Sequence, residues 1–127
     1  MQHNYIITAA ISGALAVVLG AFGAHTLKPL LEPASLENFK TGVQYQFIHT
    51  IAILMLSKMA GNENMHITRW SYYLFLSGIL LFSGSLYLLG CRQLLGITNW
   101  SFLGPLTPLG GLCFIAGWLN LIRIRQK

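Results

Sequence analysis

Apolar residues run along this chain in four long blocks that contain no charged side chain. The eleven charged residues, eight basic and three acidic, leave charge-free stretches at 1–27, 41–57, 70–91 and 93–122. A helix needs about 20 mainly apolar residues to cross the hydrocarbon core of a bilayer. Three stretches reach that length, and uncharged residues just before Lys40 let the second helix begin earlier. The pattern predicts four membrane-spanning helices, at about residues 5–25, 36–59, 69–91 and 106–122.

Composition supports the same conclusion. Hydrophobic residues make up 54% of the chain and charged residues 9%, against about 25% charged residues in a soluble domain. A water-facing surface cannot be built from so few charges. With 127 residues and short connections, we expect an all-α fold: an integral membrane four-helix bundle in which residues 1–127 form a single transmembrane domain.

The net charge of +5 indicates orientation rather than nucleic-acid binding, and we expect no nucleic-acid partner. Basic residues of membrane proteins gather at cytoplasmic ends. Four spans place both termini on one side, which would carry five basic residues, against three on the other side. The larger set is Lys58, Arg69, Arg123, Arg125 and Lys127, and the smaller set is Lys28, Lys40 and Arg92. The imbalance predicts that both termini are cytoplasmic.

Small residues recur at helical spacing in three of the predicted spans. Helices in lipid associate through close packing and polar contacts rather than hydrophobic burial, and small residues let their backbones approach. The interpretation is a tight bundle core or a seam between subunits of a homo-oligomer. The residues predicted to pack helices together are Ser12, Ala16, Gly20, Ala24, Ser77, Gly84, Gly110 and Gly117.

The second predicted span is the most polar one. Tyr45 and His49 lie one helical turn apart, and Gln46 falls in the same wedge of the helix. Unpaired polar groups in hydrocarbon cost several kcal/mol, so we expect this wedge to face the bundle interior or another subunit. His49 lies about 13 Å beyond Lys40 along the helix. It is interpreted either as a proton- or ligand-binding group or as a neutral, hydrogen-bonded histidine that fixes helix register.

No motif of metal binding or covalent catalysis is present in the sequence. His25 is expected at the membrane edge, about 10 Å or more from the level of His49, so the two do not converge on one point. Cys91 and Cys113 have no Cys-x-x-Cys spacing, and no catalytic triad or helical zinc motif is legible. We therefore expect no metal, no cofactor and no catalytic residue.

Conspicuous short motifs cover all four predicted spans. They are Gly20-Ala-Phe-Gly-Ala-His25, Tyr45-Gln46 with His49, Phe82-Ser-Gly-Ser-Leu-Tyr87, Leu103-Gly104 followed by Thr107-Pro-Leu-Gly-Gly111, and Gly117-Trp118. On these motifs the chain resembles the bacterial family called domain of unknown function 423, which is related to a small human transmembrane protein family. The resemblance implies a small multi-pass inner-membrane protein and supplies no activity. Leu109 replaces the family's usual isoleucine.

The predicted topology places most of these motifs in the outer half of the bilayer. Thr107-Pro108 is typical of a helix start, and the free N–H groups there would suit an anion or headgroup. One outward-facing polar pocket is therefore predicted, formed by His25, Tyr45, Gln46, His49, Tyr87 and Thr107.

The function predicted from the sequence is non-enzymatic. The protein would bind a small polar molecule or a lipid headgroup in this pocket, or act as a membrane assembly component. The alternatives are an oligomeric small-solute or proton-coupled transporter, and a membrane enzyme that uses His49 as general base.

Overall fold

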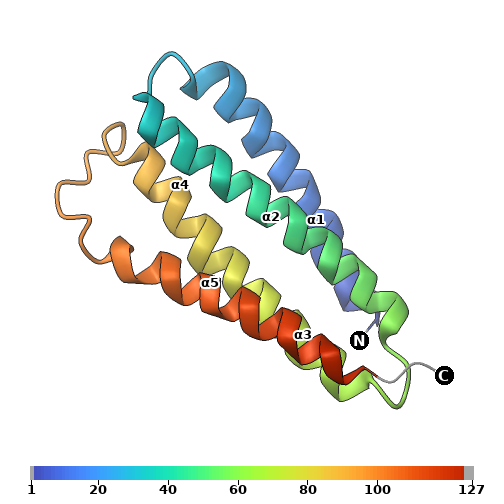
Figure 1. Ribbon diagram of the computed structural model, residues 1–127. Coiled ribbons are helices and arrows are strands. Elements are labelled where there is room, and N and C mark those ends of the chain that lie inside the picture. The colour runs from blue at the N-terminus through green and yellow to red at the C-terminus, as the bar shows by residue number, and fades with distance from the viewer. Residues whose placement is uncertain (1, 125–127) are drawn as a thin grey trace.

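Four helical rods run side by side in the computed structural model, which describes residues 2–124 (Figure 1). The first rod begins and the fourth ends at the same end of the molecule. The predicted all-α fold is confirmed for the described residues. The elements are α1 (Gln2–Phe22), η1 (Gly23–Leu27), α2 (Pro33–Met59), α3 (Met65–Gly78), η2 (Ile79–Ser83), α4 (Gly84–Cys91), α5 (Leu103–Asn120) and η3 (Leu121–Arg123).

Three of the four rods are long and apolar enough to cross a membrane: Gln2–Leu27, Met65–Cys91 and Leu103–Arg123. The α2 rod is long enough, with 27 residues, but on average its residues are not apolar enough for it to be one of these candidate spans. Its role as a fourth span therefore stays a prediction. The observed helices overlap the four predicted spans and extend beyond them by a few residues at most ends.

The start of the last rod differs from the sequence prediction. The helix begins at Leu103, and Pro108 lies inside it rather than at its first position. Proline lacks the N–H that would bond to the carbonyl four residues earlier, which here is that of Gly104. The helix accommodates Pro108 on its exposed face. The helix N-terminus with its free N–H groups is therefore not at Thr107, and the predicted anion seat there is wrong.

Two of the rods contain a π-helical segment. In η1 it continues α1 to Leu27, and in η2 it joins α3 to α4 in one continuous rod. A π turn inserts an extra residue and changes which face the following residues present, and such turns are frequent at functional sites. The η2 turn lies near the middle of its rod.

The α2 rod is central: it packs against α1 on one side and against η2 and α4 on the other, while α5 covers α3 and η2. Close approach is achieved at glycines. A Cβ on Gly42 would lie 2.9 Å from the Tyr87 ring, and one on Gly117 would lie 2.6 Å from the Phe75 ring. Gly110 is tighter still, against the backbone of Phe82.

The predicted packing residues divide into two groups. Ser12, Ala16, Gly110 and Gly117 are buried, as expected, and Gly20 is half-buried, with a Cβ position 3.4 Å from Val43. The other three do not pack against another rod of the same chain, and a role at a seam between subunits stays a prediction for them. Ala24 and Ser77 are exposed because they lie on the outer side of their rods, and a Cβ on Gly84 would meet no atom within 4 Å.

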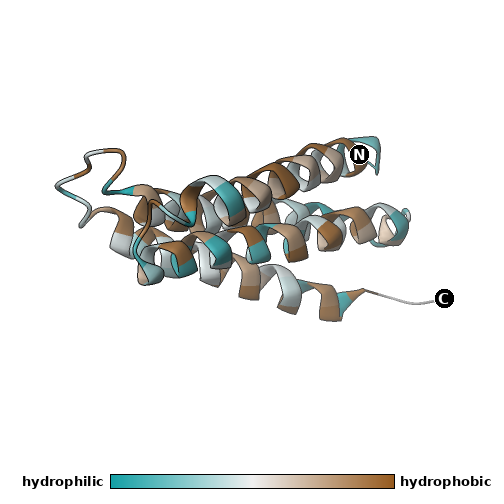
Figure 2. Ribbon diagram, turned by 90° about the horizontal axis from the view of Figure 1, so that it is seen from above, coloured by the Kyte–Doolittle hydropathy of each residue, from teal (hydrophilic) through white to brown (hydrophobic). Residues whose placement is uncertain are grey.

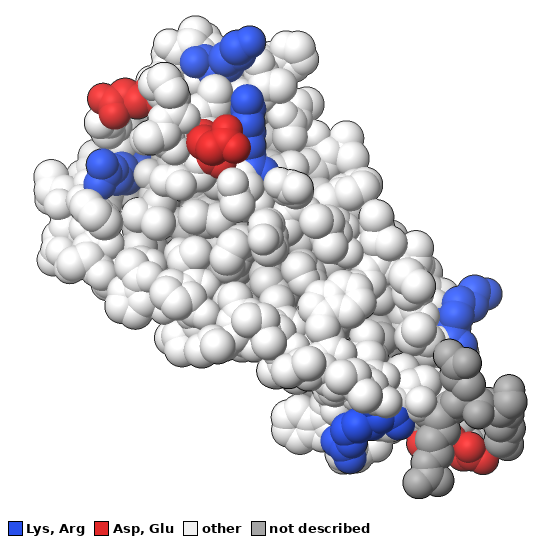
Figure 3. All heavy atoms as spheres, in the orientation of Figure 1, with Lys and Arg blue, Asp and Glu red and all other residues white. Residues whose placement is uncertain are grey.

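The outer surface of the rods is apolar, and the charges lie at the two ends. Figure 2 shows apolar residues along the rods. In Figure 3, basic and acidic side chains gather at both ends of the molecule, and the broad middle of that face carries none. Large side chains such as Val17, Leu80 and Ile115 are more than half exposed. Soluble proteins rarely show apolar surface on this scale, so the surface suits a hydrocarbon solvent.

Candidate functional site

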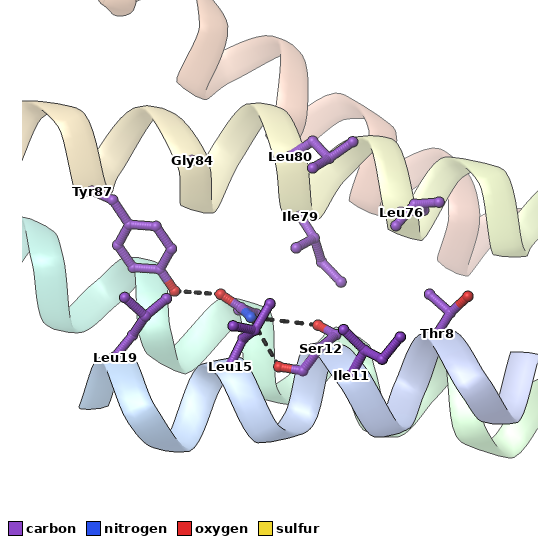
Figure 4. Close-up of a pocket in the computed structure, with 11 residues that line it drawn as sticks. Thr8, Ile11, Ser12, Leu15, Leu19, Leu76, Ile79, Leu80, Gly84 and Tyr87 are labelled. Carbon is purple, nitrogen blue, oxygen red and sulfur yellow. Dashed lines mark hydrogen bonds between the residues drawn. The ribbon is translucent and has the colours of Figure 1, made fainter. Parts of the chain in front are cut away.

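A groove runs between α1 and the continuous α3–η2–α4 rod, with α2 beneath it. We call it the α1 groove. Its volume is about 510 Å³, within the usual range of ligand pockets. Figure 4 shows side chains from α1 and from the facing rod on its two sides. It is lined by Thr8, Ile11, Ser12, Leu15, Leu19, Gln46, Leu76, Ile79, Leu80, Gly84 and Tyr87.

Gln46 reaches from α2 into the floor of the α1 groove and links three helices. Its Nε2 donates to the backbone carbonyl of Ser12 on α1 at 2.9 Å, and its Oε1 accepts from the Tyr87 hydroxyl on α4 at 2.5 Å. These bonds are drawn in Figure 4. The Ser12 hydroxyl is hydrogen-bonded to Thr50 at 2.6 Å. Nε2 of Gln46 also lies 3.4 Å from the Ser12 hydroxyl. The polar floor is therefore a connected network in which the Gln46 amide donates to Ser12 and the phenolic proton of Tyr87 is used.

Gly84 lies in the wall of the α1 groove, and no packing requirement explains it. A glycine inside a helix costs about 0.5–1 kcal/mol relative to alanine. At Gly42 and Gly110 this cost is offset by close approach of a neighbouring helix, but a Cβ at Gly84 would enter empty space. Gly84 therefore keeps the middle of the groove open.

A second groove lies between α2 and α5, with η2 at its base. We call it the aromatic groove. Its volume is about 440 Å³, and its lining residues are Tyr45, Ile48, His49, Phe82, Gly111, Phe114, Ile115 and Trp118. The two grooves share η2 as a wall: Ile79 and Leu80 face the α1 groove, whereas Phe82 faces the aromatic groove.

His49 is held by hydrogen bonds at both ring nitrogens. Nδ1 lies 2.8 Å from the Tyr45 carbonyl, and Nε2 lies 3.1 Å from the indole Nε1 of Trp118. A carbonyl only accepts and an indole N–H only donates, so Nδ1 carries the proton and Nε2 does not. The ring also stacks on Phe114 at 3.5 Å, with 9° between the planes. This geometry fits a neutral histidine that fixes helix register.

The prediction of one polar pocket from six residues is wrong. Gln46 and Tyr87 line the α1 groove, while Tyr45 and His49 line the aromatic groove, because Tyr45 and Gln46 point about 100° apart on α2 and so face different neighbouring rods. Thr107 lines neither groove and is hydrogen-bonded to Ser85 at 2.6 Å. His25 is exposed in η1, at the end of its rod, and is not part of either groove.

Several buried serines that connect helices were not identified from the sequence. Ser83 donates to the Gly42 carbonyl at 2.7 Å, and Ser71 donates to the Gly117 carbonyl at 3.0 Å. Both are fully buried. The sequence does not show which glycine of another rod each serine faces, because it does not show which helices are neighbours. The sequence indicates only that a hydroxyl group in an apolar helix needs a hydrogen-bond partner.

Metal ligands do not converge anywhere in the described residues: no group of three or more His, Cys, Asp or Glu side chains is close enough together to hold an ion. The polar atoms of the two grooves are amides, hydroxyls and ring nitrogens, which bind neutral hydrogen-bonding groups.

The architecture is that of a small helical membrane protein, and comparison with known proteins identifies the family. The family described as "Protein of unknown function (DUF423)" matches residues 19–111, and the chain belongs to it. It is 41% identical over 121 residues to the "UPF0382 membrane protein" of Haemophilus influenzae, with 95% of this chain and 92% of the relative covered. No solved structure matches significantly.

Two further relatives extend the same similarity. The chain is 39% identical over 122 residues to "UPF0382 membrane protein YwdK" of Bacillus subtilis, covering 93% of this chain and 92% of the relative. It is 40% identical over 126 residues to "UPF0382 inner membrane protein YgdD" of Escherichia coli K12, covering 96% and 92%. The family resemblance expected from the sequence motifs is thus confirmed, and the chain is a membrane protein.

Proposed function

We propose that α2 is a fourth membrane span. Its polar side chains Gln46, His49 and Thr50 are buried, whereas Ile51 and Met55 on its outer face are 47% and 54% exposed. Buried polar atoms do not meet lipid, so the low average hydropathy of α2 does not oppose insertion. At 1.5 Å per residue, its 27 residues give roughly 40 Å, enough to cross the hydrocarbon core of about 30 Å.

We further propose that the protein lies in the inner membrane with both termini in the cytoplasm. The name of the Escherichia coli relative supports the location, and the excess of basic residues at the end that holds Lys58 and Arg69 supports the orientation. Fusions of alkaline phosphatase and of green fluorescent protein after Lys127 test this. Only the fluorescent fusion should be active, and active phosphatase would contradict the proposal.

For the function, we propose that the α1 groove binds a lipid. The observation that carries this proposal is the open space at Gly84, beside the polar pair of Gln46 and Tyr87. The aliphatic lining favours a hydrocarbon chain over the small polar molecule suggested by sequence. The groove lies between rods whose outer faces are apolar, so its ligand reaches it through the bilayer.

The polar floor specifies what the lipid must offer. Tyr87 donates its proton to Gln46, and Gln46 donates to Ser12. Free lone pairs remain on the Tyr87 oxygen and on Oε1 of Gln46, because each oxygen has more than one acceptor site. A ligand with a hydroxyl donor complements them. We therefore propose a long-chain lipid with a free hydroxyl group, of which diacylglycerol is the test compound.

The proposal includes no covalent chemistry. Histidine acts as a general base through a ring nitrogen with a free lone pair. Both ring nitrogens of His49 are engaged, with the Tyr45 carbonyl and with the Trp118 indole. The proposed role is binding or storage of a lipid within the membrane, by a monomer or a homo-oligomer.

Substitution of Gly84 by leucine tests the proposal. The new side chain would occupy the α1 groove without displacing a protein atom at its Cβ. Native mass spectrometry of the protein from micelles titrated with diacylglycerol should show one bound lipid for the wild type. Gly84→Leu should weaken binding by tenfold or more, about 1.4 kcal/mol.

Gly104→Leu is the matched control, because its Cβ also meets nothing within 4 Å but Gly104 lines neither groove. It should bind diacylglycerol like the wild type. Equal binding by wild type and Gly84→Leu, or no binding by the wild type, would refute the proposed function.

A further inference from the structure

Aromatic rings dominate the lining of the aromatic groove. Tyr45 lies 4.6 Å from Phe82 and 6.2 Å from Phe114 between ring centroids. His49 stacks on Phe114, and Trp118 meets the His49 ring edge-on at 6.0 Å. Rings from α2, η2 and α5 therefore surround one space. The α1 groove, in contrast, has Tyr87 as its single aromatic residue.

Gly111 opens this space as Gly84 opens the other. A Cβ on Gly111 would meet only the Phe82 ring, at 3.8 Å, which is ordinary contact distance. Its neighbour Gly110 is pressed against the Phe82 backbone. Close helix packing therefore explains one glycine of the pair and not the other.

One hydrogen-bond donor in the aromatic groove is unused. Trp118 donates to His49, and His49 donates to the Tyr45 carbonyl. The hydroxyl of Tyr45 makes no hydrogen bond within residues 2–124, and the side chain is 38% exposed. In hydrocarbon this donor gains from any acceptor that reaches it. The groove thus offers flat apolar walls and a single donor.

We propose that the aromatic groove binds the ring of a prenylated quinone. A flat conjugated ring packs against aromatic side chains in offset or edge-to-face geometry with an attraction beyond simple burial. A quinone carbonyl accepts a hydrogen bond and donates none, which complements the Tyr45 hydroxyl. The prenyl tail would lie along the exposed side chains of Ile48 and Ile115 in the bilayer. No electron transfer is part of the proposal.

This inference does not depend on lipid binding in the α1 groove. The two grooves lie on opposite sides of η2 and share no lining residue. Each has its own glycine, so each can be filled separately.

Tryptophan fluorescence provides the assay, because Trp118 lines the groove and quinones quench indole fluorescence. In a Trp70→Phe, Trp100→Phe background, Trp118 is the one remaining tryptophan, since the chain has three. Titration in nanodiscs with a benzoquinone that carries a short prenyl tail should give saturable quenching. Tyr45→Phe should weaken the affinity by about twofold to tenfold, as expected for loss of one neutral hydrogen bond.

Gly111→Leu should abolish the saturable quenching. Gly104→Leu should leave it unchanged, because Gly104 lines neither groove and its Cβ would meet no atom within 4 Å. A competitor that carries the same tail on a saturated ring without carbonyls should fail to relieve the quenching. This comparison uses the groove without any substitution in it, so it does not depend on whether a variant folds. Linear quenching in the wild type, or equally effective competition by the saturated compound, would overturn the proposal. Unchanged affinity in Tyr45→Phe would overturn the assigned hydrogen bond.

Discussion

Two adjacent glycines of α5 should respond in opposite directions to the same substitution. An alanine Cβ at position 110 would lie 2.7 Å from the Cβ and 2.8 Å from the Cα of Phe82. Carbon atoms in favourable contact are about 3.5–4.0 Å apart. Because the obstacle includes backbone of η2, it cannot be relieved by rotating a side chain, and α5 must move outward by roughly 1 Å, as that difference in contact distance implies.

Such overpacking costs about 1–3 kcal/mol, and replacing a helical glycine with alanine returns about 0.5–1 kcal/mol. We therefore expect Gly110→Ala to lower the free energy of unfolding by about 1 kcal/mol, the difference between the middle values of these two ranges. At position 111 the new Cβ meets only the Phe82 ring, at 3.8 Å and 3.9 Å. Here only the stabilisation from replacing a helical glycine with alanine applies, so Gly111→Ala should raise the free energy of unfolding by about 0.5–1 kcal/mol.

The measurement is reversible unfolding in mixed micelles, with a denaturing detergent titrated in and helix content followed by circular dichroism. The two variants share a helix and a chemical change, so they differ mainly in contact with η2. Stability of Gly110→Ala equal to that of the wild type would refute the close approach of α5 to η2. Equal losses in both variants would show that helix α5 itself, rather than its packing, responds to the methyl group.

Three further experiments test single polar groups. Tyr5→Phe should leave stability unchanged or raise it, because the Tyr5 hydroxyl is fully buried with no partner among the described residues; a clear loss in the same unfolding assay would contradict this. A double-mutant cycle of Gln46→Leu and Tyr87→Phe should give a coupling of about 0.6 kcal/mol, the average for hydrogen bonds between membrane helices, and at most about 1.7 kcal/mol; zero coupling would contradict the bond. Trp118→Phe should expose Nε2 of His49 to diethylpyrocarbonate, detected by peptide mass spectrometry, and equal modification of the wild type would count against the assigned tautomer.

Much of the fold can be predicted from the sequence, because the bounds of the rods depend on the order of charged and apolar residues along the chain. The positions of charges determine where the rods begin and end, and the observed rods overlap the predicted spans. Helix packing was only partly predictable. Gly110 and Gly84 look alike in sequence, yet one meets a neighbouring backbone and the other meets empty space. That distinction requires knowing which rod lies opposite each glycine.

The candidate sites were harder to predict, for two physical reasons. On a helical wheel Tyr45, Gln46 and His49 share one wedge, but a wedge of about 100° is wide enough to face two different neighbours. Gln46 turns to α1 and α4, and His49 turns to α5. The η2 turn also changes the register of α4 relative to a regular α-helix, which no charge or hydropathy pattern signals. One predicted pocket is therefore two grooves.

The position of α2 follows from the same polar residues that lower its hydropathy. A membrane helix with lipid on most sides must be apolar almost all round, whereas a helix between two others can carry polar atoms on both flanks if each finds a partner. On one flank Gln46 and Thr50 pair with Ser12, and on the other His49 pairs with Trp118. The first flank is thereby tied to α1 and the second to α5. The most polar helix is thus placed at the centre because no outer position would satisfy its hydrogen bonds.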